Sequence, residues 1–140
     1  MTPEEKLQLL KLNAVISVVD DDESVRKSLQ RLLRSMGFQV ETFSSAIDFL
    51  NRGQLQAFGC AIVDVRMPVM NGLALQKTLG ASGISLPVVF ITAHEDPGVK
   101  TQALEGGAFA FLQKPFSDPS LIEAISSALE SQTSAMRSKK

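Results

Sequence analysis

Short apolar runs alternate with segments of helical spacing along most of the chain. The apolar runs are rich in Val, Ile and Phe, and they predict strands at residues 14–19, 38–43, 60–63, 87–91 and 108–112. The first, third and fourth runs are nearly continuous in apolar residues, as strands covered on both faces require. The second run alternates apolar and polar side chains, which predicts an edge strand with one face in water.

The segments between these runs predict helices, because apolar side chains recur at helical spacing and most segments begin at a possible cap. The predicted N-terminal caps are Asp22, Ser44, Asp96 followed by Pro97, and either Ser117 or Asp118. Gly37 and the pair Gly106-Gly107 are suitable helix ends. A weaker helix with unclear ends is predicted from Gly72 to Leu79.

Five strand–helix units in series predict an α/β fold. We expect a doubly wound, five-stranded and mainly parallel sheet, flanked by five helices and joined by right-handed crossovers. In such sheets, sites form beyond the carboxyl ends of the strands, where the strand order reverses. Residues 14–130 are predicted to form this domain, and the polar residues 131–140 a frayed tail or the stub of a linker.

Residues 1–13 are predicted to be a short helical N-terminal extension. Residues 2–5 (Thr-Pro-Glu-Glu) form a capping box with proline in the first helical turn, and four leucines follow. A lone helix this short is marginal in water. We therefore expect it to pack on its own domain or on a partner or preceding domain, with the latter favoured, and a disordered leader is the alternative.

Composition narrows the class of protein. The chain has 140 residues, 44% hydrophobic and 21% charged, which fits one globular domain of ordinary size. A formal net charge of −1 leaves no general basic surface, so we expect no direct nucleic-acid binding. No apolar run approaches the ~18 residues of a membrane-spanning helix, and the charged N-terminus is unlike a signal peptide. We therefore expect a cytoplasmic protein without membrane contact.

Polar side chains of complementary chemistry follow four of the predicted strands. In chain order these are the run Asp20-Asp21-Asp22, then Asp64, Thr92 and Lys114. Because parallel strands place their carboxyl ends at one edge of a sheet, we expect these side chains to lie close together. The edge therefore combines several carboxylates with one hydroxyl and one ammonium group.

This combination suits phosphoryl transfer. Crowded carboxylates raise one another's pKa, and a divalent cation such as Mg²⁺ relieves their repulsion. Lys114 and Thr92 can stabilise an oxyanion beside that cation, as phosphoryl transfer requires. A carboxylate can itself be the nucleophile, and Asp64 is the best candidate because it stands among the other groups. Each residue alone has a plainer interpretation as a cap, turn or loop residue, and only the combination favours a site.

Four motifs carry a resemblance to a known family. They are VVDDDESVRKSL at 18–29, VDVRMPVMNG at 63–72, FITAHED at 90–96 and FLQKPF at 111–116. In this order and spacing the chain resembles a response-regulator receiver domain of the FixJ-like kind, over essentially all of residues 14–130. The resemblance implies the flavodoxin-like receiver fold.

The resemblance also implies a Mg²⁺ site and a phosphoryl acceptor. Asp64 would accept the phosphoryl group. Asp21 would bind Mg²⁺ directly and Asp20 largely through water. Asp64 and the backbone carbonyl of Arg66 would complete the set of metal ligands.

Further residues would bind the phosphoryl group and respond to it. Thr92 would hydrogen-bond the group, and Lys114, joined to Pro115 by a cis peptide, would pair with it. Ala93 would leave room for the phosphodonor. Phe111 would be the switch aromatic residue, whereas core packing is its plainer interpretation.

Two residues are predicted to set the lifetime of the phosphoryl group. Arg66 and His94 lie two residues after Asp64 and Thr92, respectively. In receiver domains these positions tend to control the access of water. Our hypothesis is that Arg66 and His94 determine the rate of hydrolysis.

The predicted function is a signalling switch rather than an enzyme, since it catalyses only its own phosphorylation and dephosphorylation. The donor would be a histidine kinase or a histidine phosphotransfer protein. Phosphorylation would shift the population between two packings. The surface of the receiver's fourth helix, fifth strand and fifth helix (here the helix after Asp96, the strand 108–112 and the last helix) would change shape. This surface would regulate an unknown partner or attached output domain, and it is a candidate homodimer interface.

Two other functions and one question stay open. The chain could be an unphosphorylated, receiver-like scaffold, although the full set of acids, threonine and lysine argues against this. It could be a Mg²⁺-dependent phosphatase with an aspartyl nucleophile, but such enzymes typically carry a second aspartate where this chain has Arg66, which cannot donate a proton. The sequence leaves undecided whether the chain is a stand-alone receiver or part of a longer protein.

Overall fold

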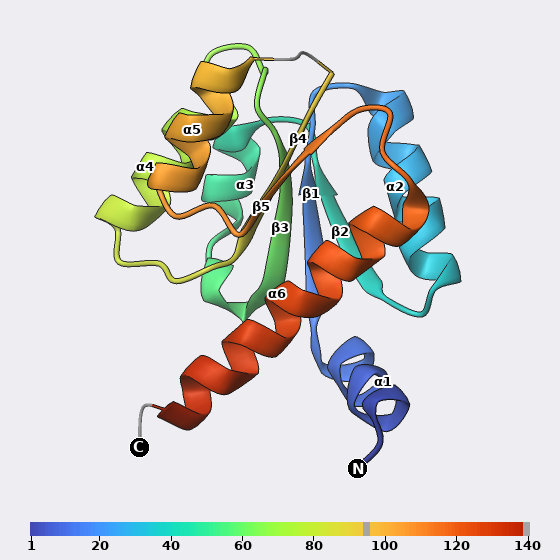
Figure 1. Cartoon of the computed structure of the whole chain (residues 1–140). Helices are drawn as coiled ribbons and strands as arrows, with labels where there is room; N and C mark the ends of the chain where they lie inside the picture. Colours follow the sequence, from blue (N-terminus) through green and yellow to red (C-terminus); the bar gives the residue numbers. More distant parts are fainter. Residues whose placement is uncertain (94–95, 139–140) are drawn as a thin grey trace.

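In the computed structural model, which describes residues 1–93 and 96–138, five parallel strands form one sheet in the order β2-β1-β3-β4-β5 (Figure 1). The strands are β1 (Val15–Val19), β2 (Gln39–Phe43), β3 (Phe58–Asp64), β4 (Val88–Thr92) and β5 (Ala110–Gln113). The predicted doubly wound parallel sheet is confirmed, and the alternating run is the edge strand β2. The third strand begins earlier than predicted, because Phe58 already pairs with Val15 of β1; the register then shifts, and Cys60 pairs with Ile16.

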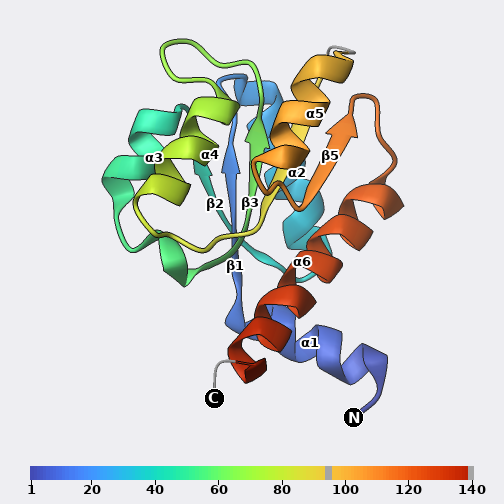
Figure 2. The ribbon, with the colours of Figure 1, turned by 60° about the vertical axis from the view of Figure 1, so that its left-hand side comes forward.

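Helices cover both faces of the sheet (Figures 1 and 2). They are α1 (Pro3–Asn13), α2 (Glu23–Ser35), α3 (Ala46–Arg52), α4 (Gly72–Ala81), α5 (Pro97–Glu105) and α6 (Asp118–Ser138), with a short 3-10 turn η1 (Leu55–Ala57) before β3. Alternate side chains of β3 enter different cores, since Cys60 and Ile62 pack with α2 and α6, whereas Ala61 and Val63 pack with α3, α4 and α5. This two-sided burial explains why the β3 sequence carries no polar side chain before Asp64.

The helix caps follow the prediction at most positions. Asp22 caps α2 and Asp96 caps α5, each through a side-chain oxygen that accepts from a backbone N–H. The predicted cap Ser44 is wrong, because the cap of α3 is Ser45, whose Oγ accepts from the Asp48 N–H at 3.0 Å. Ser45 has the extended backbone (φ −154°, ψ 161°) that a cap needs, and Ser44 donates instead to the Asp48 carboxylate.

The N-terminal helix α1 lies at the foot of the domain and contacts α6 (Figures 1 and 2). The threonine half of its capping box forms, since the Glu5 N–H donates to Thr2 Oγ1 at 3.1 Å; the Glu5 carboxylate accepts from the Thr2 hydroxyl, also at 3.1 Å. Lys11 Nζ lies 5.3 Å from the centre of the Phe38 ring, which follows α2. Contacts of α1 with its own domain are therefore present.

The last helix continues past the predicted domain boundary at residue 130. Helix α6 runs to Ser138, through most of the segment predicted as a polar tail or linker stub. Residues 131–138 contain neither glycine nor proline, so nothing in them ends a helix.

In the part of the chain that the structure describes, no helix has both the length and the apolar character to cross a bilayer.

Candidate functional site

The carboxyl ends of the strands bring the predicted side chains to one edge of the sheet. Asp20 follows β1, Asp64 ends β3, Thr92 ends β4 and Lys114 follows β5. One carboxylate oxygen from each of Asp20, Asp21 and Asp64 lies within 4.8 Å of the others. Strands β1 and β3 are neighbours in the sheet, which explains why aspartates 44 positions apart in the chain meet.

Most of this cluster is shielded from water. The exposed fractions are 0% for Asp20, 9% for Asp64 and 2% for Thr92, whereas Asp21 is exposed. Lys114 Nζ lies 3.6 Å from Asp20 Oδ2 and 3.9 Å from Asp64 Oδ2, so one ammonium group faces two buried carboxylates. These distances are too long for hydrogen bonds, and the negative charge is only partly compensated.

Asp20 has one satisfied and one unsatisfied oxygen. Its Oδ1 accepts from the Asp22 N–H at 2.9 Å, and its backbone carbonyl accepts from Arg26 Nη1 at 2.7 Å. Its Oδ2 is buried and, among the described residues, has no hydrogen-bond partner. A buried carboxylate oxygen without a hydrogen bond is unfavourable, and a bound cation would remove the deficit.

The third aspartate of the run has a structural role. Asp22 Oδ1 accepts from the Ser24 hydroxyl at 2.7 Å and the Ser24 N–H at 2.9 Å. These two bonds, the hydroxyl first, lower the pKa of Asp22. The cap therefore uses Asp22 and leaves the carboxylates of Asp20 and Asp21 to the cluster.

The Asp64 carboxyl group has a perturbed acidity. Burial first, and then the neighbouring Asp20 carboxylate, raise the pKa of Asp64 to about 6. The Arg66 N–H, which donates to Asp64 Oδ1 at 3.1 Å, and the Lys114 ammonium oppose this rise. Near neutral pH the group is thus an ionised but destabilised carboxylate, which is a good nucleophile.

Gly72 allows helix α4 to begin close to Asp64. A Cβ at position 72 would lie 2.6 Å from the Asp64 carbonyl oxygen and 2.9 Å from the Phe90 ring. The Gly72 N–H donates to the Val65 carbonyl at 2.9 Å, which folds the β3–α4 loop back over the strand end. The loop that carries Arg66 is therefore held against the cluster by a position where only glycine fits.

The loops after β4 and β5 are tied together. The Lys114 N–H donates to the Thr92 carbonyl at 2.7 Å, and the Lys114–Pro115 peptide is cis. Ala93 is exposed at the rim of the cluster. Phe111 is half-buried on β5, with its ring centre 6.4 Å from that of Phe90. The prediction for His94 lies outside the described residues.

Two residues near the site had no predicted functional role. Arg26 holds the carbonyl of Asp20, and Asp96 Oδ2 lies 3.8 Å from Arg66 Nη2. The sequence marks Asp96 only as a helix cap, and Arg26 only as a polar position on a helix. Their positions depend on how the loops fold, so no local pattern could have identified them.

A hollow of about 410 Å³ lies beside the cluster, between α2 and the β5–α6 loop. Apolar side chains line most of it, with Lys114 at the end near the carboxylates. The lining includes Val25, Leu29, Leu32 and Phe116.

Comparison with known proteins decides the family. Residues 16–126 match the response regulator receiver domain. The chain belongs to the response regulator receiver domains. It is 44% identical to the transcriptional regulatory protein TdiR of Thauera aromatica over 116 residues, and 47% identical to the response regulator protein TmoT of Ectopseudomonas mendocina over 118 residues. These matches cover 83% and 84% of the chain.

The receiver fold is shared with solved structures. The crystal structure of FixJ-N superposes with a TM-score of 0.79 at 39% identity, over 84% of this chain and 94% of that one. The chain spans about half the length of the curated relatives it matches, 51% for TdiR and 53% for TmoT. The relatives are response regulators, which are signalling proteins of two-component systems.

Proposed function

We propose that this receiver is a phosphoacceptor switch in which Asp64 accepts the phosphoryl group. A carboxylate oxygen of Asp64 would attack the phosphorus of a phosphohistidine, the P–N bond would break, and the histidine would leave with the bonding electrons. The observation that carries the proposal is the position of Asp64 between a second buried carboxylate and the Lys114 ammonium. Charge stabilisation and positioning supply most of the catalysis in such transfers.

The donor set fits a Mg²⁺ ion. The clustered carboxylates of Asp20, Asp21 and Asp64 offer hard oxygen ligands, and the unsatisfied Asp20 Oδ2 supports a bound cation. We propose that these three residues and the Arg66 carbonyl hold the ion. When bound, Mg²⁺ would supply charge neutralisation for the phosphoryl oxygens.

The remaining site residues would act on the phosphoryl group. Lys114 would neutralise its charge, the Thr92 hydroxyl would hydrogen-bond one of its oxygens, and the exposed Ala93 would leave room for the donor. Arg66 would influence how long the group survives, because its backbone already contacts Asp64. The same role for His94 stays a prediction.

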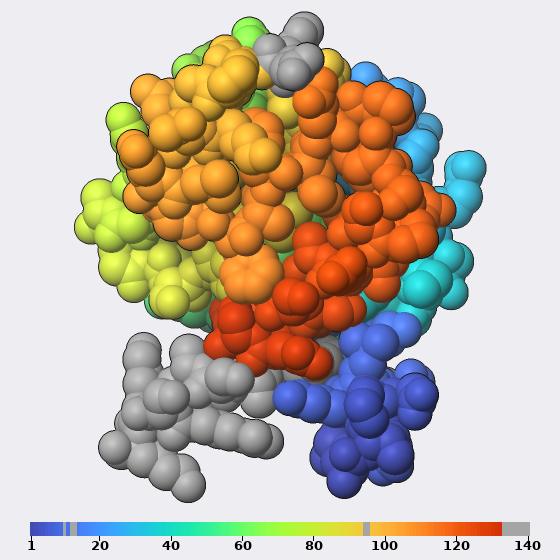
Figure 3. Space-filling model, in the orientation of Figure 1, coloured from blue at the N-terminus to red at the C-terminus, as the bar shows by residue number. Residues whose placement is uncertain are grey.

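The response would reach the surface of α5, β5 and α6. The hydrogen bond between the Lys114 N–H and the Thr92 carbonyl links the phosphoryl-binding loop to the β5–α6 loop. Phe111 is half-buried beside Phe90, so it has room for a second packing and is the proposed switch residue. Helix α5, strand β5 and helix α6 are exposed on one side of the molecule (Figure 3), although α5 and α6 pack on opposite faces of the sheet. We propose this face for output or homodimer formation.

The partners follow from the family and the surface. A histidine kinase or a histidine phosphotransfer protein would donate the phosphoryl group. The apolar hollow between α2 and the β5–α6 loop supports docking of a donor helix beside Lys114. The relative TdiR is named a transcriptional regulatory protein, which supports an output in transcription through a further domain or partner. The cytoplasmic location, and the division into residues 1–13, 14–130 and 131–140, stay predictions.

The test is phosphorylation by acetyl phosphate with and without Mg²⁺, followed by intact mass. We expect one acid-labile phosphoryl group on the wild type with Mg²⁺, and none with EDTA or on Asp64→Asn. Glu41→Gln, which changes a carboxylate on the edge strand β2 outside the cluster, should be labelled like the wild type. Many turnovers of an added phosphomonoester would favour the phosphatase, and no labelling of a folded wild type would favour the scaffold.

A further inference from the structure

An ion pair joins the β3–α4 loop to the start of α5. Arg66 Nη2 lies 3.8 Å from Asp96 Oδ2. Arg66 follows Asp64 by two residues, and its N–H donates to Asp64 Oδ1 at 3.1 Å. One residue therefore contacts the acceptor carboxylate through its backbone and α5 through its side chain.

The two oxygens of Asp96 have different partners. Oδ1 accepts from the Val99 N–H at 3.2 Å and caps α5, while Oδ2 faces Arg66. Arg66 and Asp96 both line a hollow of about 580 Å³ between the β3–α4 loop and α5. The ion pair thus lies on the wall of a space into which either side chain can move.

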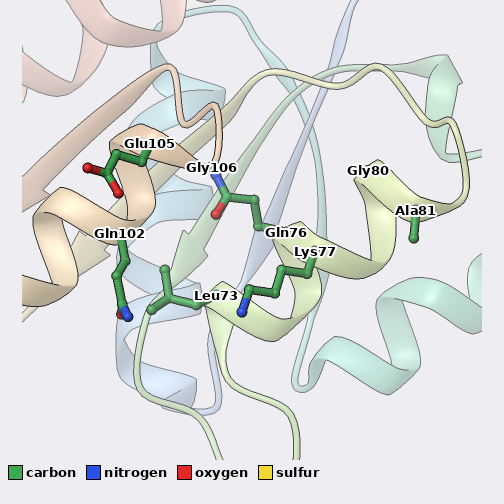
Figure 4. Close-up of a pocket in the computed structure, with 8 residues that line it drawn as sticks. All are labelled: Leu73, Gln76, Lys77, Gly80, Ala81, Gln102, Glu105 and Gly106. Carbon is green, nitrogen blue, oxygen red and sulfur yellow. The ribbon is translucent and has the colours of Figure 1, made fainter.

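The other end of α5 is held by an uncharged contact. Gln76 Nε2 of α4 donates to the Ala103 carbonyl at 3.0 Å, and Ala103 is fully buried. Figure 4 shows Gln76 reaching the end of α5 beside Gly106, where a Cβ would lie 2.7 Å from Gln76 Oε1. Helix α5 therefore has a part-buried, uncharged attachment at its C-terminal end and an exposed ionic attachment at its N-terminal end.

The ionic attachment is weak enough to be exchanged. The two side chains are 55% and 41% exposed, and exposed ion pairs contribute little to stability. Phosphorylation would replace the single charge of the Asp64 carboxylate with a phosphoryl group of about −1.5 to −2 charges, two residues from Arg66. Guanidinium groups bind phosphate oxygens through two parallel hydrogen bonds, which makes the phosphoryl group a stronger partner than Asp96.

We propose that Asp96 is a positioning residue that holds Arg66 beside α5 until Asp64 is phosphorylated, an inference that rests on the proposed function. The phosphoryl group would then draw Arg66 away from Asp96. The first turn of α5 would lose its attachment to the β3–α4 loop, while the Gln76 contact would remain. Helix α5 would move about its C-terminal end, by a route separate from Thr92 and Phe111.

Amide hydrogen exchange in the first turn of α5, at residues 99–101, tests the release. Asp96→Asn keeps a side-chain oxygen to cap the helix but removes the charge that binds Arg66. Glu105→Gln removes the same charge from the opposite end of α5 and is the matched control. We expect severalfold faster exchange in the wild type and in Glu105→Gln after reaction with acetyl phosphate and Mg²⁺. Asp96→Asn should exchange fast before the reaction and change little after it.

The rate of phosphorylation separates positioning from a structural role. Asp96→Asn should accelerate phosphorylation severalfold because a free Arg66 attracts the incoming group, and it should have no effect in an Arg66→Gln background. An equal effect in both backgrounds, or unchanged exchange in α5 of the phosphorylated wild type, would overturn the role of Asp96 alone. If the wild type takes up no more phosphate than Asp64→Asn does, the proposed function is overturned, and this inference with it.

Discussion

Two groups of charged side chains in this domain differ in how fully they are paired. At the β2 edge, Arg52 donates to both carboxylate oxygens of Glu41 at 3.1 Å, and its guanidinium lies 4.6 Å from the centre of the Phe58 ring. At the carboxyl edge, Lys114 lies 3.6 and 3.9 Å from the carboxylates of Asp20 and Asp64, beyond hydrogen-bonding distance. The Glu41 carboxylate is therefore hydrogen-bonded by its cation, whereas the carboxylates of Asp20 and Asp64 are not.

The difference indicates what each group is for. The Glu41–Arg52 pair is half-exposed and satisfied by protein atoms alone, as expected of a structural contact. In the carboxylate cluster Asp20 and Asp64 are buried, negative charge exceeds positive charge, and Asp20 Oδ2 has no hydrogen-bond partner among the described residues. Both deficits match a cation, which is the ligand that we propose for the cluster.

Removal of one carboxylate from each group should have the largest difference in effect, and the difference should appear in Mg²⁺ binding. Asp20→Ala should weaken Mg²⁺ binding by about 100-fold, equivalent to about 2.7 kcal/mol, because a buried ligand and its negative charge are lost. Glu41→Ala should leave Mg²⁺ binding unchanged. Titration calorimetry with circular dichroism as a check of folding measures both, and equal affinities for Asp20→Ala and the wild type would contradict the metal site.

Neutralising the acceptor should stabilise the metal-free protein. The pKa of Asp64 is raised from 3.8 to about 6, so its contribution to stability is full below about pH 4 and is lost as the pH rises through 6. Asp64→Asn should therefore raise the free energy of unfolding by about 2 kcal/mol at pH 7 in EDTA. Urea unfolding measures this gain, which should shrink toward pH 4 and in saturating Mg²⁺. A destabilised variant at pH 7 would contradict the unfavourable burial of the charge.

The structural pair should show the reverse behaviour. Arg52→Ala should lower the free energy of unfolding by about 1 to 2 kcal/mol, because the two-point bond to Glu41 and the contact with Phe58 are lost. Phosphorylation of Asp64 by acetyl phosphate should keep its wild-type rate. Arg52→Lys is the matched variant, since it retains the charge but not the two-point geometry. A slower phosphorylation in either variant would show that the Glu41–Arg52 pair influences the carboxylate cluster, contrary to our expectation.

A more exposed ion pair on α2 should have the smallest effect on stability and on phosphorylation. Lys27 Nζ lies 3.0 Å from Glu23 Oε1 on α2, with both side chains more than half exposed (65% and 68%). Lys27→Gln should leave the urea midpoint and the phosphorylation rate unchanged within error, because solvent screens the pair. A resolved shift in either would show that distance alone, without burial, matters here.

Much of the fold and the cluster could be predicted because the chemistry coincides with strand ends. Asp20 and Asp64 each follow an apolar run, and parallel topology brings such ends together whatever the details of packing. The caps Asp22 and Asp96 were predictable for the same local reason, since a short acceptor side chain precedes each helix.

The rest depends on loop conformation, which local patterns do not encode. Ser44 and Ser45 have the same capping chemistry, and only the backbone angles choose between them. The sequence predicts a weak helix from Gly72 with unclear ends, and the close approach of Gly72 to Asp64 requires the folded β3–α4 loop. In the same way, Asp96 is predicted as a cap, and only the path of two loops brings its second oxygen to Arg66.

Chemical trapping can identify the side chain that carries the phosphate. Wild type treated with acetyl phosphate and Mg²⁺ is reduced with borohydride, which converts an acyl phosphate to an alcohol, and the modified position is read by peptide mass spectrometry. We expect modification at Asp64 alone, with Asp20 and Asp21 unchanged. Modification at Asp20 or Asp21 would contradict the assignment of Asp64 as the acceptor. So would the absence of modification at all three aspartates.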